Sequence, residues 1–191
     1  MQASVHKRSF TADGLGICFQ YDSDWYVDES GKDRSELSVL YDTKVKATIY
    51  LLDSQIDFDN ANEETFSNLM KRACASYFQL QPAVIKEIFD FKSMELQDGK
   101  SIQMSATMEV TESTPTLRQS TLFYTLYFIR FSSGITLFAK YEEYVDNTSF
   151  RNEMDEIVRS IKVCGLPLAI EFAHSVDSVV FNDYSDFDFF S

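Results

Sequence analysis

The sequence predicts an α+β domain with a central, largely antiparallel sheet of about seven strands and helices on both faces. Many segments alternate between apolar and polar residues with a period of two, which is typical of strands. Two segments carry apolar residues at helical spacing. One strand-like run is apolar on both faces, so it needs cover on both sides. Residues 1–165 are predicted to form this domain, and residues 166–191 form an acidic, aromatic C-terminal extension packed on it.

The first third of the chain predicts short strands. Two of them flank a bend that contains Gly14 and Gly16, and a polar turn then leads to Trp25 as an aromatic anchor. A polar loop separates this part from two further strands with an alternating pattern. The predicted strands lie within residues 9–20, 25–27, 37–42 and 44–52.

Residues 63–80 predict the first helix. Asn60 or Asn62 is placed to cap its N-terminus, and Pro82 prevents its continuation. Its apolar residues form one stripe. The members of that stripe are Phe66, Leu69, Met70, Ala73, Tyr77 and Leu80.

The middle of the chain predicts two long strands, 84–97 and 100–111, joined at Asp98 and Gly99. An Asp-Gly pair between extended runs is typical of a type I′ hairpin, in which both turn residues have positive φ. Residues 122–129 are apolar on both faces and are therefore expected at the centre of the sheet.

A turn at 132–134 leads into a strand over 135–144, and a second helix is expected over 149–163. Its N-cap candidates are Asp146, Asn147 and Thr148, and Gly165 is placed as its C-terminal stop. Residues 168–172 are interpreted as one more strand.

The charge balance argues against several classes of partner. The chain has 17 basic and 30 acidic residues, a net charge of −13. Such a charge repels nucleic acid and anionic membranes, and no lysine–arginine cluster offers an exception. No apolar stretch is long enough to span a bilayer. A protein partner with a basic surface remains compatible, and we expect a monomer or weak homodimer.

Cys18, Cys74 and Cys164 are too few and too scattered for a disulfide scaffold, so we interpret them as three reduced, mostly buried thiols. The first residues carry no apolar run of a signal peptide. The sequence as written therefore predicts a cytoplasmic protein. If Met1 stands in place of a removed leader, the protein is instead exported or periplasmic.

No catalytic, cofactor or metal signature is present. His6 and His174 are the only histidines and belong to no zinc-binding pattern. A Ser–His or Cys–His pair would arise only through the fold, since the chain lacks a nucleophile-elbow motif. The acidic runs near Asp22 and Asp57 lack the glycine and glutamate of an EF-hand. We therefore predict no enzyme activity, no cofactor and no metal.

The last residues alternate acids with aromatic side chains, which is the one compositionally biased segment. Tyr184, Phe187, Phe189 and Phe190 are candidates for docking into a partner, with neighbouring aspartates selecting a basic rim. The favoured interpretation is that this tail folds back on its own sheet, because exposed aromatic side chains promote aggregation. A dimer with exchanged tails is the third alternative.

The order of elements and a few local motifs resemble the PsbP-like superfamily, which includes PsbP, a Ran-binding import factor and DcrB-type domains. The resemblance rests on Phe10, the turn 21–27 around Trp25, the Asp98-Gly99 pair before a strand, and a last helix that ends at Ser160 and Ile161. Asp22 stands where the family usually has proline. The resemblance implies a bacterial member of this superfamily with an α/β/α sandwich. It also implies a role in protein binding or assembly, without a common catalytic site.

From these observations we expect a non-catalytic module that binds proteins or assists assembly. The alternative is a carrier that holds an apolar small ligand between sheet and helix, which the surplus of phenylalanine and tyrosine suggests.

Overall fold

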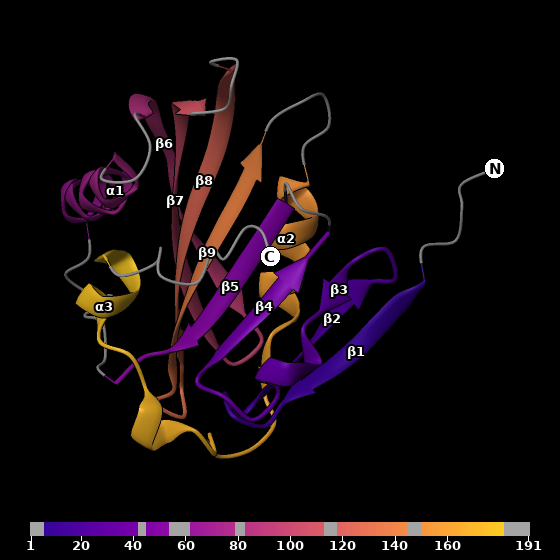
Figure 1. Ribbon diagram of the computed structural model, residues 1–191. Helices are drawn as coiled ribbons and strands as arrows, with labels where there is room; N and C mark the ends of the chain where they lie inside the picture. The colour runs from indigo at the N-terminus through magenta and orange to yellow at the C-terminus, as the bar shows by residue number, and fades with distance from the viewer. Residues whose placement is uncertain are drawn as a thin grey trace.

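A seven-stranded antiparallel sheet forms the centre of the molecule (Figure 1). The computed structural model describes residues 6–41, 45–53, 62–78, 83–112, 118–144 and 150–181. The strand order is β3-β4-β5-β9-β8-β7-β6. This arrangement confirms the predicted α+β class. The strands are β3 (Tyr26–Val27), β4 (Glu36–Leu40), β5 (Val45–Leu51), β6 (Ala83–Leu96), β7 (Gly99–Glu112), β8 (Arg118–Phe131) and β9 (Thr136–Tyr144).

A second, three-stranded sheet lies beside the first, and helices cover both faces of the large sheet. In the small sheet β2 is central, with β1 and β10 on either side. The strands of this sheet are β1 (Lys7–Ala12), β2 (Ile17–Asp22) and β10 (Lys162–Val163). The helices are η1 (Glu29–Gly31), α1 (Glu63–Phe78), α2 (Arg151–Ser160), η2 (Ile170–Phe172) and α3 (Val176–Phe181).

The large sheet separates two hydrophobic cores. The first core lies between the sheet, the small sheet and α2, and it contains Trp25. The second lies under α1 and α3 and contains Met70 and Val179. Along β8, Tyr127 belongs to the first core and Phe128 to the second. The prediction that residues 122–129 are buried on both faces is therefore confirmed.

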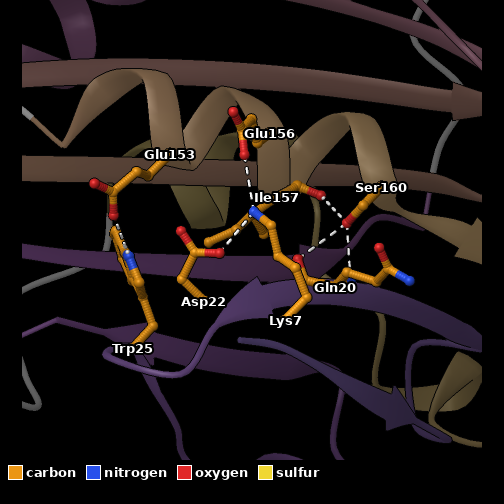
Figure 2. Close-up of polar contacts among 8 residues, drawn as sticks. All are labelled: Lys7, Gln20, Asp22, Trp25, Glu153, Glu156, Ile157 and Ser160. Carbon is orange, nitrogen blue, oxygen red and sulfur yellow. Dashed lines mark hydrogen bonds and ion pairs between the residues drawn. The ribbon is translucent and has the colours of Figure 1, made fainter. Parts of the chain in front are cut away.

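Polar contacts fasten α2 to the small sheet (Figure 2). Trp25 Nε1 donates to Glu153 Oε2 at 2.8 Å. Lys7 Nζ lies 2.7 Å from Asp22 Oδ1 and 2.8 Å from Glu156 Oε2. These two partners raise the pKa of Lys7, first through hydrogen bonding to Asp22. The contacts hold the small sheet, and with it the start of the C-terminal segment, in a fixed place.

The helix caps agree only partly with the prediction. Asn62 Oδ1 accepts from Thr65 N at 2.9 Å, so Asn62 caps α1 as expected. The predicted caps of the second helix, at 146–148, lie outside the described residues. The N-cap of α2 is Phe150, which provides no side-chain hydrogen bond. Its amide instead donates to Glu143 Oε1 at 3.2 Å, so a strand residue distant from the cap supplies the acceptor.

Two local predictions are wrong. The hairpin between β6 and β7 exists, but its turn residues are Gln97 and Asp98, and neither Asp98 nor Gly99 has positive φ. Gly99 serves packing, because a Cβ there would lie 2.3 Å from the Arg130 oxygen. Residues 168–172 form no strand, since η2 occupies 170–172.

The prediction of three reduced thiols is wrong for two of them. Cys18 and Cys164 form a disulfide with a Cα–Cα distance of 5.9 Å. Pairing of β10 with β2 places Lys162 opposite Cys18, which brings the two cysteines together across 146 residues of sequence. Cys74 is a buried thiol as expected, and burial raises its pKa to about 12.

Candidate functional site

The chain between β10 and α3 carries an exposed row of large apolar side chains, which we call the apolar belt. It consists of Leu166, Leu168, Ile170 and Phe172, whose exposed fractions are 87%, 70%, 62% and 73%. Single exposed apolar residues are ordinary, but four within seven residues of one segment are an unusual concentration of exposed apolar surface. The belt crosses from the small sheet to α3, on the second face of the large sheet (Figure 1).

The start of the belt lies against the turn between β1 and β2. Cys164 N donates to Gly16 O at 2.9 Å, and Leu168 N donates to Asp13 O at 3.1 Å. Gly16 has a φ of 69°, and a Cβ there would lie 2.7 Å from Gly165 O. Only glycine allows this approach without strain.

Backbone alternation explains why the apolar side chains face outward. Pro167 and Ala169 lie between the belt residues and are buried against the body. Ala169 N also donates to Gly14 O at 3.1 Å. With these inner positions fixed, Leu166, Leu168 and Ile170 project away from the molecule.

His174 anchors the other end of the belt. Its amide donates to Leu51 O at 2.8 Å, and its carbonyl accepts from Asp53 N at 2.9 Å. The ring lies edge-on to Tyr50, with ring centroids 5.3 Å apart. Nε2 shares a hydrogen bond of 3.1 Å with Ser35 Oγ. A short parallel bridge to β5 thus joins the segment to the large sheet.

Ser35 and His174 resemble part of a nucleophilic pair, and sequence reasoning expected such a pair only through the fold. Within the described residues no carboxylate contacts the His174 ring. A third group that orients the histidine is therefore missing from this arrangement. The observed contacts of His174, with Ser35 before β4 and with Tyr50 and Leu51 of β5, instead fix the belt to the large sheet, which is a structural role.

A cavity of about 500 Å³ opens beside the belt. Phe172 and Ala169 provide its apolar wall, whereas the opposite side is mostly charged. Asp33 and Glu36 outnumber Arg34 in this lining, and the whole chain is acidic as well. The complete lining is Asp33, Arg34, Ser35, Glu36, Ala169, Phe172 and His174.

A second cavity, of about 480 Å³, lies between α1 and the strands β6 and β7. Ile88, Phe89 and Met104 line its sheet side, but Glu63 and Glu64 line its helix side. Carboxylates lose hydration when an apolar molecule covers them, so this cavity does not suit the apolar ligand of the carrier hypothesis.

The candidate residues chosen from the sequence lie elsewhere. Tyr184, Phe187, Phe189 and Phe190 are outside the described residues. Sequence reasoning does not find the belt, because it interprets residues 168–172 as a strand of the sheet. Every second side chain of such a strand would be buried against the core. The signal available in the sequence was the series Leu166, Leu168, Ile170 and Phe172, in which every second residue is a large apolar one and Pro167 lies between the first two.

The described residues contain no group of three or more His, Cys, Asp or Glu side chains placed to hold a metal ion. In the same part of the chain no helix is long and apolar enough to cross a membrane.

Comparison with solved structures identifies the fold. The Ran-binding protein Mog1p of Saccharomyces cerevisiae superposes with a TM-score of 0.54 at 10% identity, over 87% of this chain and 100% of the other. A mutant of Mog1 gives 0.53 at 9% identity, over 85% and 98%. Cyanobacterial PsbP from Synechocystis gives 0.49 at 11% identity, over 85% and 95%. The chain therefore shares the fold of Mog1p, as the resemblance noted in the sequence led us to expect. No family model and no curated protein matches the sequence.

Proposed function

We propose that this chain is a non-catalytic protein-binding module that docks through the apolar belt. The carrying observation is the exposure of Leu166, Leu168, Ile170 and Phe172 on a segment that is fixed at both ends. A fixed segment loses little conformational entropy on binding, so its apolar area converts efficiently into affinity. The Ran-binding activity named for Mog1p agrees with a protein-binding role for this fold.

The partner surface is apolar at its centre and basic at its rim. Large exposed side chains such as Phe172 are the type that fills a pocket on a partner. Asp33 and Glu36 line the cavity beside Phe172, Glu171 lies between Ile170 and Phe172 in sequence, and the chain has a net charge of −13. Opposite charge on the partner speeds association and excludes acidic competitors.

Capture from lysate of the source organism tests this proposal with matched variants. The belt variant is Leu168→Ser/Phe172→Ser, and the control is Tyr26→Ser/Val84→Ser, which removes two exposed apolar residues elsewhere. We expect wild type and control to retain the same protein and the belt variant to lose it. With the purified partner, the Kd should rise at least thirtyfold, as for a hot-spot residue. Equal retention by both variants would contradict the proposal.

The disulfide supports an oxidising compartment as the place of action, in keeping with the exported alternative. Disulfides persist in secreted and periplasmic proteins and are rare in the cytosol. Trapping thiols with an alkylating reagent during lysis, followed by mass spectrometry, tests this. Cys18 and Cys164 should be recovered as a disulfide. Recovery of both as alkylated thiols would place the protein in a reducing compartment.

A further inference from the structure

The cavity beside the belt combines an apolar wall with charged side chains. Phe172 and Ala169 form the apolar part, and the Phe172 side chain belongs to a residue with 73% of its surface exposed. Asp33, Arg34 and Glu36 supply the charges of the lining. Two carboxylates and one guanidinium group leave the lining with one net negative charge when histidine is neutral. The cavity therefore attracts a cation and offers it an aromatic ring.

The two carboxylates of the lining are available to a ligand. Within the described residues, neither the Asp33 nor the Glu36 carboxylate forms an ion pair or a hydrogen bond. Each has a lysine within the range of its electric field, Lys32 for Asp33 and Lys140 for Glu36, but is bonded to neither. Lys32 instead pairs with Asp13 at 3.1 Å. A cation that enters the cavity therefore meets two carboxylates without displacing a bonded partner.

The end of β5 holds the two walls of the cavity together. Leu51 N donates to Ser35 O at 2.8 Å, and Leu51 O accepts from His174 N at 2.8 Å. The side chains of Ser35 and His174 share the hydrogen bond of 3.1 Å between the walls, and Ser35 is buried. The chain itself makes all these bonds, so the walls need little ordering when a ligand binds.

Arginine is the cationic side chain that suits this lining best. Its guanidinium group is planar, carries several N–H donors and stacks on aromatic rings, whereas the lysine ammonium group is a compact and strongly hydrated charge. The cavity offers carboxylates at two positions, Asp33 and Glu36, together with the ring of Phe172. Its volume of about 500 Å³ also leaves room for the aliphatic stem of the side chain.

We propose that this cavity is a pocket for an arginine side chain of the protein that docks on the belt. Phe172 belongs both to the belt and to the cavity lining, so a partner that covers the belt also reaches the cavity. The guanidinium group donates to Asp33 and Glu36 and stacks on the Phe172 ring. This inference rests on the proposed function for its partner, and it narrows the basic rim of that partner to one residue type at one place.

Titration of the isotope-labelled full chain with Nα-acetyl-L-arginine amide, followed by NMR, tests the pocket without a partner. We expect the amide signals of Ser35 and His174 to shift saturably, with a Kd in about the millimolar range. The citrulline analogue, which has nearly the same shape but no charge, and the lysine analogue should both bind more weakly. Asp33→Asn/Glu36→Gln should raise the Kd of the arginine probe about fivefold. The control Glu63→Gln/Glu64→Gln removes the same charge from the first turn of α1 and should keep the wild-type Kd.

Each other result overturns the proposal in a distinct way. Equal binding of the citrulline analogue means that charge does not select the ligand, and tighter binding of the lysine analogue rules out arginine. An equal loss of affinity in the α1 control means that the net charge of the chain, and not the cavity, attracts the probe. No shift at Ser35 and His174, while the belt variant still loses its captured protein, refutes the pocket and leaves the proposed function standing. Probe binding in the cavity, with equal capture by the belt variant and its control, refutes the proposed function and the partner assigned to the pocket.

Discussion

At the scale of single residues, Lys140 is a basic side chain that is buried inside the folded chain. It lies on the central strand β9 with 3% of its surface exposed, and its ammonium group donates to Val179 O. The Tyr50 ring centroid is 5.2 Å from Nζ, which adds a cation–π contact. Burial lowers the pKa of Lys140 to about 7. A charged lysine is therefore less favourable in the folded chain than in the unfolded one.

This burial makes stability depend on pH. Between pH 7 and about pH 10 the unfolded chain holds the Lys140 proton while the folded chain has released it, so the free energy of unfolding rises with pH. In Lys140→Met this rise should be absent, and the variant should be more stable than wild type near pH 7. Urea unfolding between pH 6.5 and about pH 9.5 measures this pH dependence. The range ends there because burial raises the pKa of Tyr127 and Tyr141, so that stability falls again above about pH 10.

The matched control removes a lysine from the surface. Lys86→Met on β6 breaks an ion pair with Glu109 in which both side chains are about half exposed. Such a pair contributes under about 1 kcal/mol. The control should keep the wild-type rise with pH, since Lys140 is intact. A rise of the same size in Lys140→Met would mean that this lysine is hydrated in the folded chain.

Single residues also show where sequence reasoning ends. The role of a side chain can be predicted when its partner lies close in sequence, as for Asn62, whose side chain caps α1 by accepting from Thr65 N. Cys18 with Cys164, and Ser35 with His174, are pairs separated by 146 and 139 residues. Nothing local distinguishes these residues from ordinary ones. Only the register of β10 on β2, and the bridge between His174 and Leu52 just after β5, bring them together.

At the scale of elements, the turn between β1 and β2 is the surface against which the first part of the belt packs. Gly16 has positive φ and lies so close to the backbone of Gly165 and Pro167 that an added Cβ would clash with both residues. Gly16→Ala should lower the free energy of unfolding by about 2 kcal/mol, from left-handed backbone strain and the clash. Gly165→Ala is the control, because nothing lies within 4 Å of its added Cβ. Thermal unfolding of both should show a clear loss only for Gly16→Ala, and equal losses would remove the turn from this role.

The elements themselves were predictable wherever the periodicity was long. Helix α1 begins at the predicted residue 63, and β6 and β7 lie within a residue of the predicted ends. The prediction of a strand at 168–172 is wrong. The alternation there arises because Pro167 and Ala169 are buried between exposed belt residues, and not because the segment pairs with a neighbouring strand. A short alternating segment has the same pattern in both cases. The acceptors at Asp13 and Gly14 that decide between them lie far away in sequence.

At the scale of the whole molecule, the net charge of −13 acts on folding and on binding in opposite directions. Salt screens repulsion between like charges, so moderate NaCl should raise the free energy of unfolding. The same screening should weaken association with a basic partner and slow its on-rate. Urea unfolding and partner association, each from about 0.05 to 0.5 M NaCl, measure both. Binding that strengthens along with stability would contradict a basic rim on the partner.

The Cys18–Cys164 disulfide ties the two ends of the domain together. Cross-linking residues 146 apart removes conformational entropy from the unfolded chain equivalent to about 5 kcal/mol at most. Cys18→Ser/Cys164→Ser should therefore unfold at clearly lower urea concentration. Reductant should have the same effect on wild type and none on the variant.

The structure also predicts where the loss is felt. Hydrogen exchange at Leu168 and Ala169, whose amides bond to the β1–β2 turn, should accelerate more than at His174, which β5 holds independently. The belt would then be loose at its first end and fixed at its second. Binding through the belt should weaken accordingly, because ordering that end costs entropy at the moment of association. Uniform acceleration at all three amides would show that the disulfide acts on global stability alone and does not position the belt.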